Sequence, residues 1–174
     1  MLYRDLSDSY LADVRRPVIH NARLELADAI RSEVIDLALA NEDFKDLMEA
    51  RRVLECALIR RVARQGVRQV PAGEHILHEM AELAEAGEDV YFVSTPLHLA
   101  VMHRAGSPVL EKLETVLFEI TTDVQRQLYR FKIDPKQVLA GHRQLYNEMV
   151  SGDEERAVAA VNAHLDDTLK TLTH

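Results

Sequence analysis

Three histidines occupy positions from which helical periodicity turns side chains inward, and imidazole is a common metal ligand. His142 follows Val138 by four residues and His164 follows Val161 by three, so both lie on the apolar side of their segments. His98 lies on the apolar side of a third segment. Three imidazoles that meet inside a helical protein suit Zn²⁺, Ni²⁺ or a similar borderline ion.

The two later histidines are expected at a similar height above the turn that joins their helices. Ten residues separate His142 from Gly152, and twelve separate Gly152 from His164. In antiparallel helices joined by a short turn, residues at equal distance from the turn lie side by side. The spacing therefore favours convergence on one point. Hydrogen-bonded core histidines without a metal are the alternative that spacing alone leaves open.

The other histidines and the single cysteine carry less information. His75 and His78 stand three residues apart, a spacing that can clamp a metal, but surface positions are favoured. His103 is expected to lie off the inner face of its helix. Cys56 has no partner for an intrachain disulfide and is expected to be a buried, inert thiol.

Helices are expected over most of the chain, because Leu, Ala, Glu and Arg dominate and only six Gly and five Pro interrupt them. One further short helix could lie within the first 20 residues. No strand or repeat is evident. The sequence therefore predicts an all-α fold, an antiparallel bundle of about six or seven helices. The expected helices cover about residues 21–40, 44–66, 71–87, 95–106, 109–131, 135–150 and 153–170.

Several helix starts are marked by capping residues. Asp134, followed by proline, and Asp153, after a Ser-Gly turn, are predicted N-caps. Ser94 or Thr95 is a plausible N-cap with Pro96 in the first turn, and a kinked continuous helix is the alternative. In the helix over 109–131, apolar residues recur at helical spacing and are expected to point inward. These are Leu110, Leu113, Leu117, Ile120, Val124 and Leu128.

Length and charge restrict the class of protein. A chain of 174 residues suits one domain, or one domain with an extension, and 47% hydrophobic residues favour a globular fold. The formal net charge of −8 argues against direct nucleic-acid binding. No apolar run approaches the roughly 20 residues of a membrane helix, and no signal segment is evident, so a cytoplasmic protein is expected. A basic run is expected to be a solvated surface; it consists of Arg51, Arg52, Arg60, Arg61 and Arg64.

Three motifs in order carry a family resemblance. The segment EARRVLE fits an E-x-R-x-x-φ-E helix through Glu49, Arg51, Leu54 and Glu55. STPLHLAVMHRAGSP corresponds to a D-x-x-F-H helix that is followed by small residues and N-P. HRQLYNEMVSGDEERAVAAVNAH corresponds to H-x-x-φ, a Gly-Asp turn, an Ala-rich helix start and a second histidine. Over about residues 44–170 the chain resembles the FadR-type C-terminal effector domain (FCD) of GntR-family transcription regulators.

The resemblance implies a metal site and a class of ligand. His98, His142 and His164 match the family's metal ligands, whereas its aspartate ligand falls on Ser94, so water could complete the coordination. The usual Phe and Asn of the middle motif are replaced by Leu and Ser. Domains of this family typically bind small organic acids, with the metal taking a carboxylate oxygen. Arg51 could clamp that anion, and a surface ion pair is its alternative role.

The resemblance also suggests a division of the chain and an oligomeric state. Residues 1–43 are expected to form a helical extension and residues 44–174 the FCD-like bundle. Family members carry an N-terminal winged helix-turn-helix, for which residues 1–43 are too short. The chain is therefore expected not to contact DNA directly, as an effector domain separated from its regulator or a natural stand-alone form. A homodimer is expected.

Two other functions remain open at the level of the sequence. Three histidines and a water are also the arrangement of catalytic zinc, for which Glu55 is the available general base. Glu55 could otherwise orient a water or a histidine. A third possibility is an interaction module that pairs with a full-length regulator and blocks it.

Overall fold

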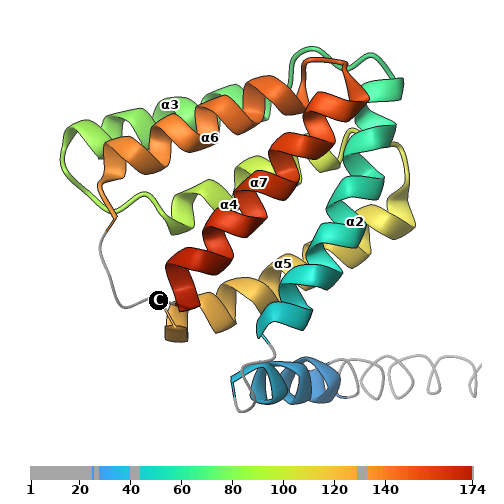
Figure 1. The fold of residues 1–174 in the computed structure, drawn as a ribbon, viewed down its shortest axis with the longest axis vertical. Helices are drawn as coiled ribbons and strands as arrows, with labels where there is room; N and C mark the ends of the chain where they lie inside the picture. Colours follow the sequence, from blue (N-terminus) through green and yellow to red (C-terminus); the bar gives the residue numbers. More distant parts are fainter. Residues whose placement is uncertain (1–24, 26–27, 40–43, 129–132, 174) are drawn as a thin grey trace, which may run out of the picture.

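The computed structural model describes residues 25, 28–39, 44–128 and 133–173, which are almost entirely helical (Figure 1). Among these residues there are seven α-helical segments and no strand, so the predicted all-α fold is confirmed. A helix over residues 28–39 precedes the labelled elements. These are α2 (Phe44–Arg64), α3 (Pro71–Glu85), the short 3₁₀ turn η1 (Phe92–Ser94), α4 (Thr95–Met102), α5 (Pro108–Leu128), α6 (Pro135–Met149) and α7 (Glu154–Thr173).

The helices form a bundle in which elements distant in sequence lie side by side. α2 packs against α7 and α5, and α6 packs against α7 on one side and α3 on the other. Figure 1 shows that α3 and α6 lie side by side across one end of the bundle. The short α4 contacts α2, α3, α5 and α6, so it lies at the centre of the bundle. α4 thus packs directly on α6, which carries one of the other predicted histidines, and α6 packs on α7, which carries the other.

The helix boundaries follow the predicted capping signals. The Asp134 carboxylate accepts a hydrogen bond from the backbone N–H of Lys136, and Asp153 accepts from Glu155 and Arg156, so both N-caps are confirmed. Ser94 occupies the N-cap position of α4 with the proline in the first turn, but its side chain makes no capping bond. The 3₁₀ turn η1 runs directly into α4, and the backbone of Ser94 is itself helical, so the helical path continues through this position.

The core is filled by large apolar side chains from every helix of the bundle. Met80, Leu97, Met102, Met149 and Leu165 are completely or almost completely buried and belong to one continuous core cluster. Close packing of this kind contributes the main stabilising free energy of a helical bundle. The core therefore fixes α3, α4, α6 and α7 relative to one another.

One close helix–helix approach depends on a glycine. A Cβ added to Gly73 of α3 would lie 2.8 Å from a ring carbon of Tyr146 on α6. The Tyr146 ring is itself held in place, because its hydroxyl accepts a hydrogen bond of 3.0 Å from the backbone N–H of Val70. The absence of a side chain at position 73 thus allows α3 and α6 to pack closely.

The long helix α5 is rotated relative to the prediction. Leu113, expected to point inward, is 54% exposed, so that prediction was wrong. Ile120 and Val124 are buried as expected, but the buried face also carries polar side chains. These are Glu114, Thr121 and Gln125. The physical reason is that α5 packs against α2 where α2 carries buried charged residues, so a polar face of α5 is turned inward.

The helix over residues 28–39 is attached to the outer side of α5. The Arg31 guanidinium forms ion pairs with Asp123 and Glu119 of α5. The expected short helix in the first 20 residues, the break at 41–43 and the end of the long helix near Phe131 lie outside the described residues. The division of the chain at residue 43 stays a prediction. None of the described helices combines the length and the apolarity needed to cross a bilayer.

Candidate metal and ligand site

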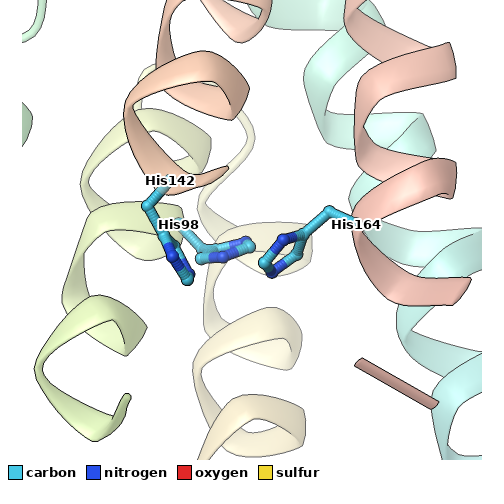
Figure 2. A group of neighbouring side chains, drawn as sticks. All are labelled: His98, His142 and His164. Carbon is cyan, nitrogen blue, oxygen red and sulfur yellow. The ribbon is translucent and has the colours of Figure 1, made fainter. Parts of the chain in front are cut away.

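Three helices each contribute one histidine to a single cluster. His98 comes from α4, His142 from α6 and His164 from α7, and Figure 2 shows the three rings turned toward one another. One ligand nitrogen from each ring lies within 4.8 Å of the other two. The ring centroids of His142 and His164 are 4.8 Å apart, as the similar spacing of these residues from the turn predicts. The convergence predicted from the sequence is therefore present.

The orientation of His142 is fixed by its own helix. Its Nδ1 lies 2.8 Å from the carbonyl oxygen of Val138, one turn earlier. A carbonyl only accepts hydrogen bonds, so Nδ1 carries the proton and donates it. The lone pair of the neutral ring is then on Nε2, the nitrogen that remains for a metal.

His98 is oriented in the same way by a buried carboxylate. Its Nδ1 lies 3.3 Å from Oε2 of Glu55, which is completely buried on α2. Burial raises the pKa of Glu55, but Arg51 and the hydrogen bond to His98 outweigh burial, and the net pKa is lowered. The ionised carboxylate accepts from Nδ1–H, which again leaves Nε2 for a metal. Carboxylate–histidine pairs of this type are the usual second layer of a metal site.

Arg51 completes the charge balance around Glu55. Its Nε and Nη2 lie 2.8 Å and 2.7 Å from Oε1 of Glu55, and its guanidinium stacks on the Phe118 ring at 3.9 Å. The residue is only 4% exposed, so its expected place on a solvated surface was wrong. A surface interpretation fails because α5 covers this face of α2. The neighbouring Arg60, Arg61 and Arg64 are exposed, as expected.

Two of the three rings, those of His142 and His164, favour the neutral form of imidazole. Burial lowers the pKa of His142 to about 4, with His98 adding to the effect. Burial also lowers the pKa of His164 well below its usual value, with further contributions from His98 and His142. Because a metal binds the deprotonated ring, these shifts remove the competition with protons near neutral pH.

A small cavity lies among the three rings. Its volume is about 30 Å³, room for an ion and a water molecule. Ser94, at the position of the family's aspartate, lines this cavity, and its hydroxyl donates a 2.6 Å hydrogen bond to the Tyr91 carbonyl. Arg51 also lines it, whereas Glu55 lies behind His98 and does not. The remaining lining residues are Tyr91, Thr95, Phe118, Gln125 and Thr168.

A second, larger pocket adjoins the cavity between α6 and α7. It measures about 210 Å³ and shares Tyr91, His142, His164 and Thr168 with the metal cavity. Its other lining residues are Ile133, Gln137, Val138, Gly141, Asp167 and Thr171. A molecule that reaches the histidines from this side therefore has space for several further atoms.

The donor set fits a borderline divalent metal. Three imidazole nitrogens with oriented rings are typical ligands of Zn²⁺ and related ions. Two nitrogens bound to one zinc are about 3.4 Å apart in tetrahedral geometry. Because the observed spread is up to 4.8 Å, the rings would have to close in slightly to hold one ion together. Within the part of the chain that the structure describes, no other group of three such side chains is found.

Several residues near the site were missed by the sequence analysis. Phe118 contacts both the Arg51 guanidinium and the His98 ring, whose centroid is 5.3 Å away. Glu114 is completely buried one turn earlier, and neither carboxyl oxygen has a hydrogen-bond partner. Burial raises its pKa to about 8, with the charge of Glu55 adding to the effect. Phe118 and Gln125 are seven residues apart and therefore lie on the same face of the helix, beside its apolar residues. This spacing was the signal in the sequence that could have placed them near the site.

The other candidate residues lie where the sequence predicted. His75, His78 and His103 are exposed, and none of them joins the cluster. Cys56 is buried on α2, and burial raises the pKa of its thiol. These residues have no direct part in the site.

Comparison with known proteins agrees with this architecture. The model of the FCD domain matches residues 46–167, which is more than half of the chain. The HTH-type transcriptional regulator LutR of Bacillus subtilis is 24% identical over 135 residues, covering 74% of this chain. The chain spans 62% of the length of that relative. No solved structure matches. The chain therefore belongs to the FCD domain family, a family of ligand-sensing regulatory domains and not of enzymes.

Proposed function

We propose that this domain senses a small organic carboxylate at a divalent metal ion held by His98, His142 and His164. The observation that carries the proposal is the meeting of three inward imidazoles from α4, α6 and α7 around one cavity. Zinc or nickel is the proposed ion, since neutral imidazoles suit both. Three neutral ligands leave the charge of the dication uncompensated. This residual charge would attract a carboxylate oxygen of the ligand.

The residues around the cavity have distinct proposed roles. Glu55 holds His98 in the orientation that a metal requires, through the 3.3 Å contact with Nδ1. Arg51 lines the cavity and is the proposed anchor for the second carboxylate oxygen. Ser94, in place of an acidic ligand, is proposed to hydrogen-bond a water or a ligand atom. The Phe118 ring stacks on the Arg51 guanidinium and is proposed to hold it in position.

Ligand binding is proposed to change the packing of the bundle. The metal ligands come from three helices, so closing the rings around an ion and an acid draws α4, α6 and α7 together. α5 contributes Phe118 and Gln125 to the same cavity and carries the ion pairs to Arg31 on its outer side. A shift of α5 would therefore reach the helix over residues 28–39. In a homodimer that regulates transcription, such a shift would change the spacing of the attached DNA-binding domains.

Ligand screening with and without metal tests this function. Protein stripped by a chelator, reloaded with zinc and mixed with acetate or succinamate should melt at a higher temperature than zinc-loaded protein alone. The stripped protein should show no such shift, and H142A should behave like the stripped protein. An H75A variant, which changes an exposed histidine of α3, should behave like the wild type. Equal shifts in stripped and zinc-loaded protein would contradict a metal-dependent sensor.

A further inference from the structure

The second, larger pocket is a groove between two consecutive helices, which diverge from their connecting turn (Figure 1). Its lining residues recur at helical spacing on both walls of this α6–α7 groove. They are Gln137, Val138, Gly141 and His142 on α6, and His164, Asp167, Thr168 and Thr171 on α7. On each wall the histidine is the lining residue nearest the turn. The groove therefore leads away from the turn and from the metal cavity.

Neither backbone geometry nor packing among the described residues requires glycine at position 141. Gly141 lies in the middle of α6, and it is not one of the glycines with a positive φ. A Cβ at this position would meet no described atom within 4 Å, whereas a Cβ at Gly73 would collide with the Tyr146 ring. Glycine inside a helix lowers stability relative to alanine. The reason for this glycine is therefore sought in the groove that it lines.

We infer that Gly141 keeps the groove open for the chain of the ligand, and that the ligand is an elongated acid. Its carboxylate binds the metal, and its chain leaves the cavity past His142 and runs over Gly141. The inference rests on the proposed function, because the metal fixes one end of the ligand. A larger side chain at position 141 would occupy the part of the groove that the chain enters first.

The length of the groove sets the length of the chain. Five residues separate Gln137 from His142, and seven separate His164 from Thr171. These intervals correspond to about 7 to 10 Å along the helix axes. Bonds of about 1.5 Å in a zigzag chain cover this distance with about six to eight chain atoms. Acetate is too short to enter the groove, whereas 6-hydroxyhexanoate spans it.

The lining suits a chain of methylene groups with a polar end. Val138 is buried beside Gly141 and offers apolar surface to the middle of the chain. At the far end, the Gln137 amide donates and accepts hydrogen bonds. The Thr171 hydroxyl donates to the Asp167 carbonyl and is left as an acceptor. The rim of the groove is exposed, so a polar end keeps part of its hydration there.

Isothermal titration of zinc-loaded wild-type protein measures the preference for length. We expect 6-hydroxyhexanoate to bind about tenfold or more tightly than acetate, because its methylene groups leave water. The affinity for 4-hydroxybutyrate should lie between the two. Equal affinity for the three acids, or tighter binding of acetate, would overturn the inference.

Substitutions at two neighbouring positions of α6 assign the preference to the groove. G141L fills the groove beside His142 and should lower the affinity ratio of 6-hydroxyhexanoate to acetate about fivefold or more. G141A should keep the fold at least as stable as in the wild type and lower the ratio less. A140L adds the same leucine at an exposed position that lines neither the metal cavity nor the groove, so the ratio should not change.

The affinity ratio cancels any change of metal binding that both acids share. Elemental analysis and circular dichroism show whether each variant holds zinc and is folded. A ratio that is unchanged or raised in both G141A and G141L, or lowered equally in A140L, would contradict the role of Gly141.

Titrations with and without zinc separate the two proposals. Equal binding of both acids, and only to zinc-loaded protein, would retain the metal-dependent sensor and overturn the role of Gly141. Binding of 6-hydroxyhexanoate without zinc that G141L weakens and A140L does not would retain the groove as a ligand site and overturn the role of the metal. Zinc-loaded protein that binds neither acid would overturn both proposals.

Discussion

Oε2 of Glu55 lies 3.3 Å from Nδ1 of His98, although the two residues are 43 positions apart in the sequence. Oε1 of the same carboxylate pairs with Arg51. One buried side chain thus connects an arginine that lines the cavity to a predicted metal ligand. This relationship makes the stability of the apoprotein and the properties of the site depend on the same residues.

The buried ion pair should show strong coupling in stability. R51M leaves the Glu55 carboxylate buried without its cation and is expected to lower the free energy of unfolding by about 3–5 kcal/mol. R51M/E55Q removes both charges and should recover a large part of that loss. Urea unfolding of the two single variants and the double variant measures the coupling. If the losses of stability in the two single variants add up to the loss in the double variant, the two side chains are not energetically coupled.

Glu114 should make the protein less stable as the pH rises. Its pKa in the folded protein is raised to about 8, so the folded state keeps a proton that the unfolded chain releases near pH 4.5. The folded state therefore binds more protons in this window, and stability falls with rising pH. Between pH 6.5 and 8 the loss should be on the order of 2 kcal/mol.

The variant E114Q isolates this contribution. Glutamine has the shape of the protonated acid and does not titrate, so the stability difference between E114Q and wild type should grow in favour of E114Q from pH 6.5 to 8. Urea unfolding at a series of pH values measures it. A difference that stays constant over this range would show that Glu114 is ionised in the folded protein.

The histidine cluster should give the opposite slope at lower pH. The pKa of His142 is lowered to about 4, and that of His164 is also lowered, both mainly by burial. The unfolded chain takes up protons near pH 6.5 while the folded state does not. Stability of the metal-free protein should therefore be complete above that pH and fall as the pH drops toward 4.

An asparagine substitution tests the assignment to one residue. H142N keeps a polar side chain that does not titrate and should flatten the slope of stability between pH 4 and 6.5. Proton NMR titration of the imidazole signals in metal-free wild type gives an independent value. A His142 signal that titrates near pH 6.5 would contradict the lowered pKa of this residue.

The contact between α3 and α6 should not tolerate a side chain at position 73. The Cβ of G73A would come within 2.8 Å of the Tyr146 ring, so this variant is expected to lose about 1–3 kcal/mol of stability. G141A on α6 is the matched control, since its Cβ would meet nothing within 4 Å. Alanine there should be neutral or stabilising by up to about 1 kcal/mol. Thermal melting of both variants measures the contrast, and equal effects would contradict the close packing.

Helical periodicity was enough to predict the fold and the convergence of the histidines. His142 and His164 flank one turn at nearly equal spacing, so local geometry alone brings their rings together. The polar interior could not be predicted in this way. Arg51 and Glu114 are buried because α2 and α5 meet face to face, and the assumption that charged residues face solvent fails at such a contact. The same assumption led to the wrong prediction that Leu113 points inward.

Metal content is the most direct test of the central claim. Purified wild-type protein, dialysed against zinc and then against metal-free buffer, should retain about one zinc ion per chain by elemental analysis. H142A and H164A should retain less than a tenth of that amount while keeping a helical circular dichroism spectrum, and H78A should retain as much as the wild type. Zinc content that is unchanged in folded H142A and H164A, or absent from the wild type, would contradict a metal site at these three histidines.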